Sequence, residues 1–237
     1  MKVYLLSIEE LQEKIVPETA CMSRLDSYRR EKAEQMKAPG ARYLSIGAGL
    51  LLQLAGSERS DREQADRAQI EIFSVTQLLH RLERNLSPRE FTYVYGAKGK
   101  PQFADKLGGT DGFPFFNLSH SGSYVCCAAA DREVGIDIQQ MRPMRNFRVA
   151  DRYFSARERE ALDACEELQL REQLFYEIWV KKEAYAKLTG EGIGTGISID
   201  TMPSVTTDGK AEPVVWHGME APAGYCMAVC TYRKDAL

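Results

Sequence analysis

The sequence predicts an α+β protein made of two lobes. Short apolar runs typical of strands are followed by amphipathic helices and then by further strands, and this succession occurs once in each half of the chain. With 237 residues the chain can bury a substantial core in one large domain or in two smaller ones. We therefore predict an N-terminal lobe over residues 1–118 and a C-terminal lobe, carrying the candidate metal site, over residues 119–237.

The N-terminal half opens on a short apolar run, Val3–Ile8, which predicts a strand. The charged stretch from Gly56 to Arg67 has almost no apolar residues and predicts a loop. Apolar residues three and four apart predict helices at Glu9–Ile15, Ser23–Lys37, Ala41–Leu54 and Ser74–Asn85. Further strands are expected at Phe91–Tyr95 and Phe113–Leu118.

The C-terminal half begins with a predicted loop, Ser119–Ser123, followed by the nearly all-apolar run Tyr124–Ala130, which indicates a buried strand. Ser155 with Glu158 three residues later is a capping-box pattern, and it predicts a helix over Ala156–Leu168. The remaining expected elements are a helix at Asn146–Tyr153 and strands at Val134–Gln139, Ile197–Asp200, Pro213–His217 and Tyr225–Thr231.

Composition excludes several classes of protein. Hydrophobic residues make up 44% and charged residues 27% of the chain, as in ordinary globular proteins. A formal net charge of −3 gives no general reason to expect nucleic-acid binding. The first ten residues hold too short an apolar run for a signal peptide, and no stretch approaches membrane-spanning length. Six scattered cysteines without a C-x-x-C pair suggest neither a disulfide framework nor a zinc site, so we expect a cytoplasmic protein without a membrane partner.

A long helix is predicted from Phe175 to Gly190, where glycine commonly ends a helix in the left-handed conformation. On this helix Trp179, Glu183 and Lys187 are each four residues apart and fall on one stripe. One interpretation is an ordinary Glu–Lys pair on a solvated face, with the tryptophan in the core. The other is a functional stripe that presents a carboxylate and an ammonium.

The strand Val134–Gln139 alternates apolar residues with Gly135, Asp137 and Gln139, which therefore share one face. Two oxygen ligands on one face suit a hard cation such as Mg²⁺, which takes one or two carboxylates and completes its octahedron with water and phosphates. A half-buried strand with its polar side in water explains the pattern equally well.

Ser119 and His120 do not predict a hydrolase dyad. Adjacent residues in an extended segment point apart and cannot readily bond as nucleophile and base, and no G-x-S-x-G elbow is present. A hydroxyl and an imidazole remain good donors to a phosphate. Basic residues of the helix at 23–37, with Arg42, form either a solvated face or a phosphate-binding cluster.

Taken together, Gly135-Ile-Asp137 and Trp179-x-x-Lys-Glu-Ala-Tyr-x-Lys187 resemble the two-part signature of 4′-phosphopantetheinyl transferases, specifically the larger monomeric type that activates peptide synthetases. Three further segments resemble family segments in the expected order: Gly99-Lys-Pro101, Phe116-Asn-Leu-Ser-His-Ser121 and Arg152-Tyr-Phe-Ser155. The clear resemblance runs from about Gly99 to Gly192. Many members carry an acidic residue where this chain has Gln139, which leaves the third ligand of the metal open.

The resemblance implies two similar lobes related by pseudo-twofold symmetry, with coenzyme A and Mg²⁺ in the cleft between them. The family transfers 4′-phosphopantetheine from coenzyme A to a serine of an acyl or peptidyl carrier protein. It implies that Asp137 and Glu183, with Gln139 as a further candidate, hold Mg²⁺. Glu183, or a water that it orients, would take the serine proton, and Lys187 would stabilise the leaving group. The implied contacts to the phosphates of coenzyme A are Lys100, Ser119 and His120 and, less directly, Arg29, Lys32, Lys37 and Arg42.

Two other functions fit the same residues. One is a Mg²⁺-dependent phosphohydrolase that uses the carboxylates on free nucleotides, and a requirement for a carrier protein would separate it from a transferase. The other is a non-catalytic module that binds coenzyme A or carrier domains, in which Gln139 marks the loss of the metal. Metal-dependent turnover would exclude this module.

Overall fold

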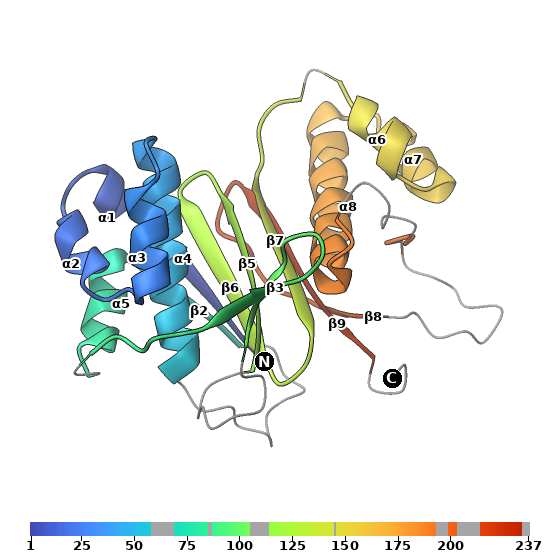
Figure 1. The fold of residues 1–237 in the computed structure, drawn as a ribbon. Coiled ribbons are helices and arrows are strands. Elements are labelled where there is room, and N and C mark those ends of the chain that lie inside the picture. Colours follow the sequence, from blue (N-terminus) through green and yellow to red (C-terminus); the bar gives the residue numbers. More distant parts are fainter. Residues whose placement is uncertain are drawn as a thin grey trace.

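The computed structural model describes residues 1–57, 69–84, 87–104, 114–144, 146–192, 199–202 and 214–233, and these form a mixed α+β fold (Figure 1). The described helices are α1 Glu9–Gln12, α2 Glu18–Met22, α3 Ser27–Glu34, α4 Pro39–Ser57, α5 Val75–Leu82, α6 Arg148–Tyr153, α7 Ala156–Asp163 and α8 Leu168–Thr189. The described strands are β1 Lys2–Ser7, β2 Gln69–Phe73, β3 Tyr93–Tyr95, β4 Pro101–Phe103, β5 Phe115–Ser121, β6 Tyr124–Ala130, β7 Val134–Gln140, β8 Val214–His217 and β9 Tyr225–Tyr232.

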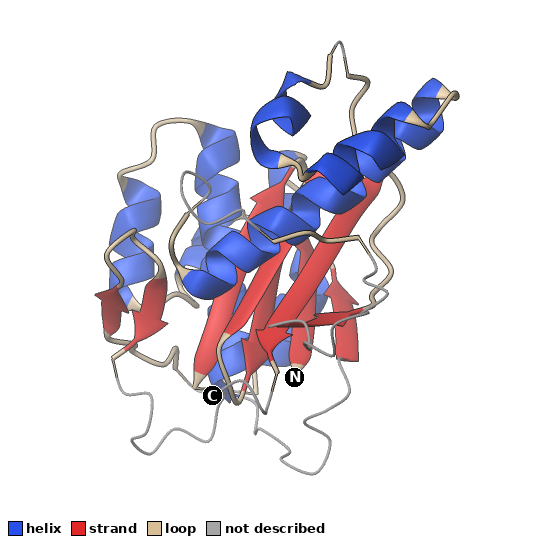
Figure 2. Cartoon of the chain, turned by 90° about the vertical axis from the view of Figure 1, so that its right-hand side faces the viewer, coloured by secondary structure: helices blue, strands red, loops and turns tan. Residues whose placement is uncertain are grey.

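The strands form two larger sheets and one hairpin. The first sheet has the order β2-β1-β6-β5, in which β2 runs parallel to β1 and the other neighbours are antiparallel. The second sheet has the antiparallel order β7-β9-β8, and β3 pairs with β4 in the hairpin. Helices α1–α5 cover one side of the strands, and α8 crosses the other side obliquely (Figures 1 and 2).

The core is divided into layers by the alternation of side chains along the strands. Tyr4 and Leu6 of β1 face the N-terminal helices, whereas Val3 and Leu5 face the second sheet. Strand β6 divides in the same way, so both of its faces are buried, as its apolar sequence predicts. A third cluster lies between the second sheet and α8, and a fourth joins α6, α7 and the first half of α8.

Side chains of β5 connect the two sheets. Asn117, Ser119 and Ser121 point to one face of β5, and each accepts a hydrogen bond from a backbone N–H of β7. The donors are Ile136, Ile138 and Gln140, at 3.2, 3.4 and 2.9 Å. Since both strands advance by two residues from one bond to the next, β5 and β7 run side by side in a fixed register. This connection brings Ser119 next to Asp137.

Most predicted elements are confirmed, although α7 ends at Asp163 rather than Leu168 and α8 begins at Leu168 rather than Phe175. The capping box at Ser155 and Glu158 is formed, and α8 ends at Gly190, whose φ of 75° is the left-handed conformation expected there. Two strands, β2 and β4, and the short helix α2 were not predicted. The loop predicted at Gly56–Arg67 is wrong for Gly56 and Ser57, which belong to α4, and residues 58–67 lie outside the described residues. The first half of the strand expected at Ile197–Asp200 also lies outside them, and Ile199 and Asp200 are not in a strand.

The loop predicted at Ser119–Ser123 is wrong over its first three residues. Strand β5 continues to Ser121, and the turn consists of Gly122 and Ser123. Polar residues continue the strand because their side chains meet the backbone of β7 rather than water. Consequently Ser119 and His120 lie on opposite faces of a strand, in agreement with the argument against a hydrolase dyad.

The predicted lobe boundary between residues 118 and 119 falls inside β5. Strand pairing changes from the first sheet to the second between Ala130 and Val134. A division by sheets would therefore follow β6, and the division into lobes itself stays a prediction. Among the described helices, none combines the length and apolar character needed to cross a membrane. None of the six cysteines, all of which are described, forms a disulfide.

Candidate active site

The candidate site lies where α8 crosses β7, and a glycine brings the two elements together. A Cβ atom on Gly135 would lie 2.0 Å from the carbonyl oxygen of Ala184 and 2.7 Å from the backbone nitrogen of Leu188. Any side chain here would therefore collide with the backbone of the helix. Gly135 shares a face of β7 with Asp137, and α8 occupies the space above it. This close approach brings Glu183 and Lys187 over the polar face of β7.

Asp137 is at the centre of the site. Its side chain is 1% exposed, and its Oδ1 accepts hydrogen bonds from Lys187 Nζ at 2.6 Å and from Ser119 Oγ at 2.7 Å. The Nε2 of Gln139 donates to Oδ2 at 3.1 Å. Lys187 also donates to Ser119 Oγ at 2.7 Å. Residues far apart in sequence thus form one hydrogen-bonded group around a buried carboxylate.

Glu183 lies beside this group without sharing its bonds. Burial raises the pKa of its carboxyl from 4.5 to about 7, the charge of Asp137 adds to the rise, and Lys187 opposes it. Glu183 forms no hydrogen bond or ion pair within the described part of the chain. The interpretation of Glu183 and Lys187 as an ordinary surface pair is therefore wrong, because the ammonium bonds to Asp137 instead. Trp179 packs among aromatic rings, 5.8 Å from Tyr153 and 6.3 Å from Phe175, so the interpretation as core packing is confirmed.

His120 is near the site but on the other face of β5 from Ser119. Partial burial lowers the pKa of its imidazole, as does the positive charge of Lys187, while Asp137 opposes both. The ring is therefore mostly neutral at pH 7, and it can still donate one hydrogen bond to an anion.

Lys100 has structural partners in addition to its predicted role at a phosphate. Its Nζ lies 2.7 Å from Glu133 Oε2 and 2.8 Å from the carbonyl oxygen of Leu188, and the side chain is 9% exposed. A cation at the carbonyl end of α8 stabilises the helix terminus. Lys100 therefore joins the β3–β4 hairpin to the last turn of α8, close to Lys187.

The four basic residues predicted from the N-terminal region are not joined to Asp137, Glu183 or Lys187 by any hydrogen bond or ion pair that the structure describes. Arg29 is 5% exposed and lies over the ring of Tyr93 at 5.3 Å, so its burial does not favour contact with a phosphate. Arg42 pairs with Glu18 at 2.7 Å. Lys32 is half-buried and Lys37 is exposed. As phosphate contacts, all four stay predictions.

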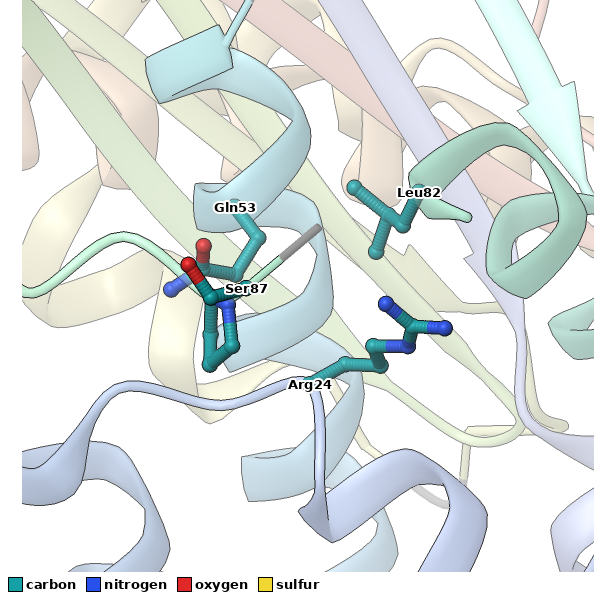
Figure 3. A pocket seen from close by; sticks show the side chains of 5 residues that line it. Arg24, Gln53, Leu82 and Ser87 are labelled. Carbon is teal, nitrogen blue, oxygen red and sulfur yellow. The ribbon is translucent and has the colours of Figure 1, made fainter. Parts of the chain in front are cut away.

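Two cavities lie elsewhere and contain none of the predicted site residues. The smaller, of about 10 Å³, is lined by Arg24, Gln53, Leu82, Ser87 and Pro88 (Figure 3). It can hold at most about one water molecule and is too small for a nucleotide. The larger, of about 370 Å³, lies on the β9 side of α8 and is lined by Met141, Gln173, Glu177, Val180, Lys181, Met219, Ala221, Tyr225, Cys226 and Met227.

The donor atoms of the site fit a hard divalent cation, although the described residues contain no group of three or more His, Cys, Asp or Glu side chains placed to hold a metal. Asp137 and Glu183 are two neighbouring carboxylates, and the pKa of Glu183 is raised first by burial and then by the negative charge of Asp137. A cation with a preference for oxygen would relieve that charge. Gln139 can supply a carbonyl oxygen, because the bond to Asp137 uses its amide nitrogen.

The sequence did not predict the supporting partners Asn117, Ser121 and Glu133. The strand predicted here ended at Leu118, so it included Asn117 but not Ser121. The hydrogen bonds that use them connect residues 19 to 33 positions apart, so no local pattern reports them.

Comparison with known proteins agrees with this site. Residues 133–231, which include β7 and α8, match the sequence model of the 4′-phosphopantetheinyl transferase superfamily. The 4′-phosphopantetheinyl transferase psf-1 of Bacillus pumilus is 40% identical over 129 residues, which cover 51% of this chain and 54% of the relative. AcpT of Escherichia coli K12 is 38% identical over 123 residues, 51% of this chain and 59% of its own. Sfp of Bacillus subtilis is 32% identical over 127 residues, 51% of this chain and 56% of its own.

The chain thus spans a little over half the length of these curated relatives. The matched residues contain Asp137, Glu183 and Lys187, which form the centre of the site. Over these residues the chain is similar to the 4′-phosphopantetheinyl transferase superfamily.

Proposed function

We propose that this protein transfers 4′-phosphopantetheine from coenzyme A to a serine hydroxyl of an acyl or peptidyl carrier protein and releases adenosine 3′,5′-bisphosphate. The observation that carries the proposal is the convergence of Asp137, Glu183 and Lys187 where α8 crosses β7. The relatives named above bear the name of this activity, which supports it.

Asp137 and Glu183, with the carbonyl oxygen of Gln139 as a further candidate, would hold Mg²⁺ in this site. A magnesium ion would neutralise the pyrophosphate of coenzyme A and make its phosphorus more electrophilic. The remaining chemistry falls to side chains. Glu183, with its raised pKa, accepts the proton of the carrier serine directly or through a water that it orients. The serine oxygen bonds to the phosphorus that carries pantetheine, and the bond to the bridging oxygen of the pyrophosphate breaks.

Lys187 would stabilise the charge that develops on the departing adenosine 3′,5′-bisphosphate. In the structure its ammonium is bound to Asp137 and Ser119. Lys187 therefore has two roles in the proposal: it neutralises Asp137 in the free protein and contacts a phosphate in the loaded one. Ser119 bonds to both Asp137 and Lys187, and together with His120 and Lys100 it is a further candidate for contact with the phosphates.

The proposal includes two similar lobes. The strand orders β1-β6-β5 and β7-β9-β8 support this similarity. In each half the first strand, β1 or β7, pairs with the second strand of a later hairpin, β6 or β9. Each half also contains one long helix, α4 or α8, packed on these strands. A pseudo-twofold relation between the halves, a binding cleft between them, a monomeric state and a cytoplasmic location are parts of the proposal.

Intact mass spectrometry of apo carrier proteins tests the activity. The protein is incubated with coenzyme A, Mg²⁺ and a panel of apo acyl and peptidyl carriers, with and without EDTA. We expect at least one carrier to gain the mass of phosphopantetheine in a Mg²⁺-dependent way. Cleavage of coenzyme A without any carrier would instead support a phosphohydrolase. Binding of coenzyme A without modification of any carrier would support a non-catalytic module.

A further inference from the structure

Lys182 and Glu158 form a buried ion pair that the proposed reaction does not use. Lys182 Nζ lies 2.9 Å from Glu158 Oε2, and the two side chains are 1% and 0% exposed. The lysine belongs to α8, and the glutamate is the third residue of α7. Placing two charges out of water costs free energy that their attraction only partly returns, so the pair needs further partners.

Those partners complete a network of three segments. Glu158 Oε1 accepts hydrogen bonds from the backbone nitrogen and the hydroxyl of Thr201, both at 2.8 Å. Its Oε2 accepts from the backbone nitrogen of Ser155 at 2.7 Å. Lys182 Nζ also donates to the carbonyl oxygen of Ile199 at 2.8 Å and lies 5.8 Å from the centre of the Phe154 ring. The network therefore attaches α8 to the start of α7 and to residues 199–201.

Lys182 immediately precedes Glu183 on α8. Successive residues on a helix point about 100° apart, so fixing Lys182 on one side fixes the direction in which Glu183 leaves the helix. It fixes Lys187 as well, because that residue lies one turn beyond Glu183. Apolar residues of the third cluster hold α8 against the second sheet, and the Lys182 network adds a polar attachment of the helix to α7 and to residues 199–201.

We infer that Lys182, through Glu158, is a positioning residue that sets the rotation of α8 and thereby aims Glu183 and Lys187 at Asp137. The expected effect of this positioning on kcat rests on the proposed function. Its structural consequence, the joint binding of a divalent cation by Asp137 and Glu183, can be measured without any transfer reaction.

The test compares Lys182→Met, Glu158→Gln and the double variant. Lys182→Met leaves a buried carboxylate without its counter-charge, so we expect its melting temperature to fall well below that of wild type. The double variant removes both charges at nearly constant volume and should regain most of that stability. The double variant still lacks the hydrogen bond that Lys182 donates to the carbonyl oxygen of Ile199 in wild type. We therefore expect its kcat to stay about tenfold or more below wild type, with the KM for coenzyme A within about twofold.

Mg²⁺ affinity, measured by calorimetry in the presence of coenzyme A, is the second readout, and it should fall severalfold in the double variant. Arg171→Met is the matched control, because Arg171 and Asp163 form an exposed pair at 2.5 Å that also joins α8 to α7. This control should keep wild-type kcat and Mg²⁺ affinity. Glu158→Gln keeps the bond between Lys182 and Ile199, and it serves as the milder variant if Lys182→Met and the double variant do not fold.

A stability-restored double variant with wild-type kcat and Mg²⁺ affinity would overturn the inference and leave the pair with a purely structural role. If only Glu158→Gln folds, unchanged kcat and Mg²⁺ affinity in that variant would overturn it too. If wild-type protein modifies no carrier, the proposed function fails, while the Mg²⁺ affinities still decide whether Lys182 positions Glu183.

Discussion

At the scale of single residues, the properties of the site follow from the burial of Asp137. A carboxylate that is 1% exposed needs hydrogen bonds and a counter-charge, and here Ser119, Gln139 and Lys187 supply them. Glu183 lacks such partners in the described part of the chain, so burial, together with the charge of Asp137, raises the pKa of its carboxyl. Two neighbouring carboxylates with different environments can therefore take different roles.

Replacing Lys187 by methionine should affect both the stability of the protein and its response to Mg²⁺. The variant leaves Asp137 buried without its counter-charge, so we expect a loss of about 1–3 kcal/mol in unfolding free energy, more than for an exposed helical pair. Mg²⁺ can replace the missing charge, and it should raise the melting temperature of Lys187→Met more than that of wild type. Thermal melts with Mg²⁺ or EDTA measure both effects. If Mg²⁺ raises the melting temperatures of both proteins equally, Lys187 is not part of the metal site.

Glu183 should make stability depend on pH in metal-free protein. Its carboxyl has a pKa of about 7 when folded, against 4.5 as the ordinary value, so the folded state binds the proton more tightly. The resulting stabilisation is complete below about pH 4.5 and is lost as the pH rises through about 7, and solvent screening of the partly exposed carboxyl reduces its size. Relative to Glu183→Gln, wild type should lose stability between pH 5 and pH 8 in EDTA. Denaturant unfolding at both pH values measures this difference, and a constant difference would refute the raised pKa.

Ser119 can be compared with Ser121, which occupies the equivalent position two residues later. Each hydroxyl accepts a backbone N–H of β7, but only Ser119 also contacts Asp137 and Lys187. Both alanine variants should therefore lose about 1–2 kcal/mol of stability. Only Ser119→Ala should lower the affinity for Mg²⁺ in calorimetry. Equal Mg²⁺ affinities in the two variants would mean that Ser119 merely joins the sheets.

At the scale of elements, the contact of α8 with β7 decides whether the site forms. Gly135→Ala places a methyl group against the backbone of α8, which cannot rotate away as a side chain could. We expect a loss of about 1–3 kcal/mol and a large fall in transfer rate, because the helix must move away from Asp137. Gly40→Ala is the control, since no atom lies within 4 Å of its added Cβ and alanine favours the helix there. Unchanged activity in Gly135→Ala would refute the close-approach argument.

Elements with local signals were predictable from the sequence. The capping box of Ser155 and the terminal glycine of α8 each act within a few residues, so sequence patterns report them. Strand β2 escaped prediction because its partner, β1, is about 67 residues away, and parallel pairing leaves no turn signature. The end of β5 was misjudged for a related reason. Its serines look like loop residues until β7 lies beside them.

At the scale of the whole molecule, the composition of the site was predictable, but its bonding was not. Asp137, Glu183 and Lys187 were identified from spacing on a strand and a helix and from the family resemblance. Helical spacing suggested that Lys187 pairs with Glu183, four residues away, whereas the fold pairs it with Asp137, 50 residues away. Lys100 was expected at a phosphate and has Glu133 and the end of α8 as partners. Such pairs form only when distant segments pack together, so local spacing in the sequence does not predict them.

The central claim is that Asp137 and Glu183 act together as one site for phosphopantetheine transfer. The most direct test is the initial rate at which an apo carrier gains mass from coenzyme A and Mg²⁺ with wild type, Asp137→Ala, Glu183→Ala and the double variant. Residues that serve one site are strongly non-additive, so each single variant should abolish transfer, and the double variant should be little worse than either. Modest losses that simply add in the double variant, from proteins that fold normally, would contradict a shared site.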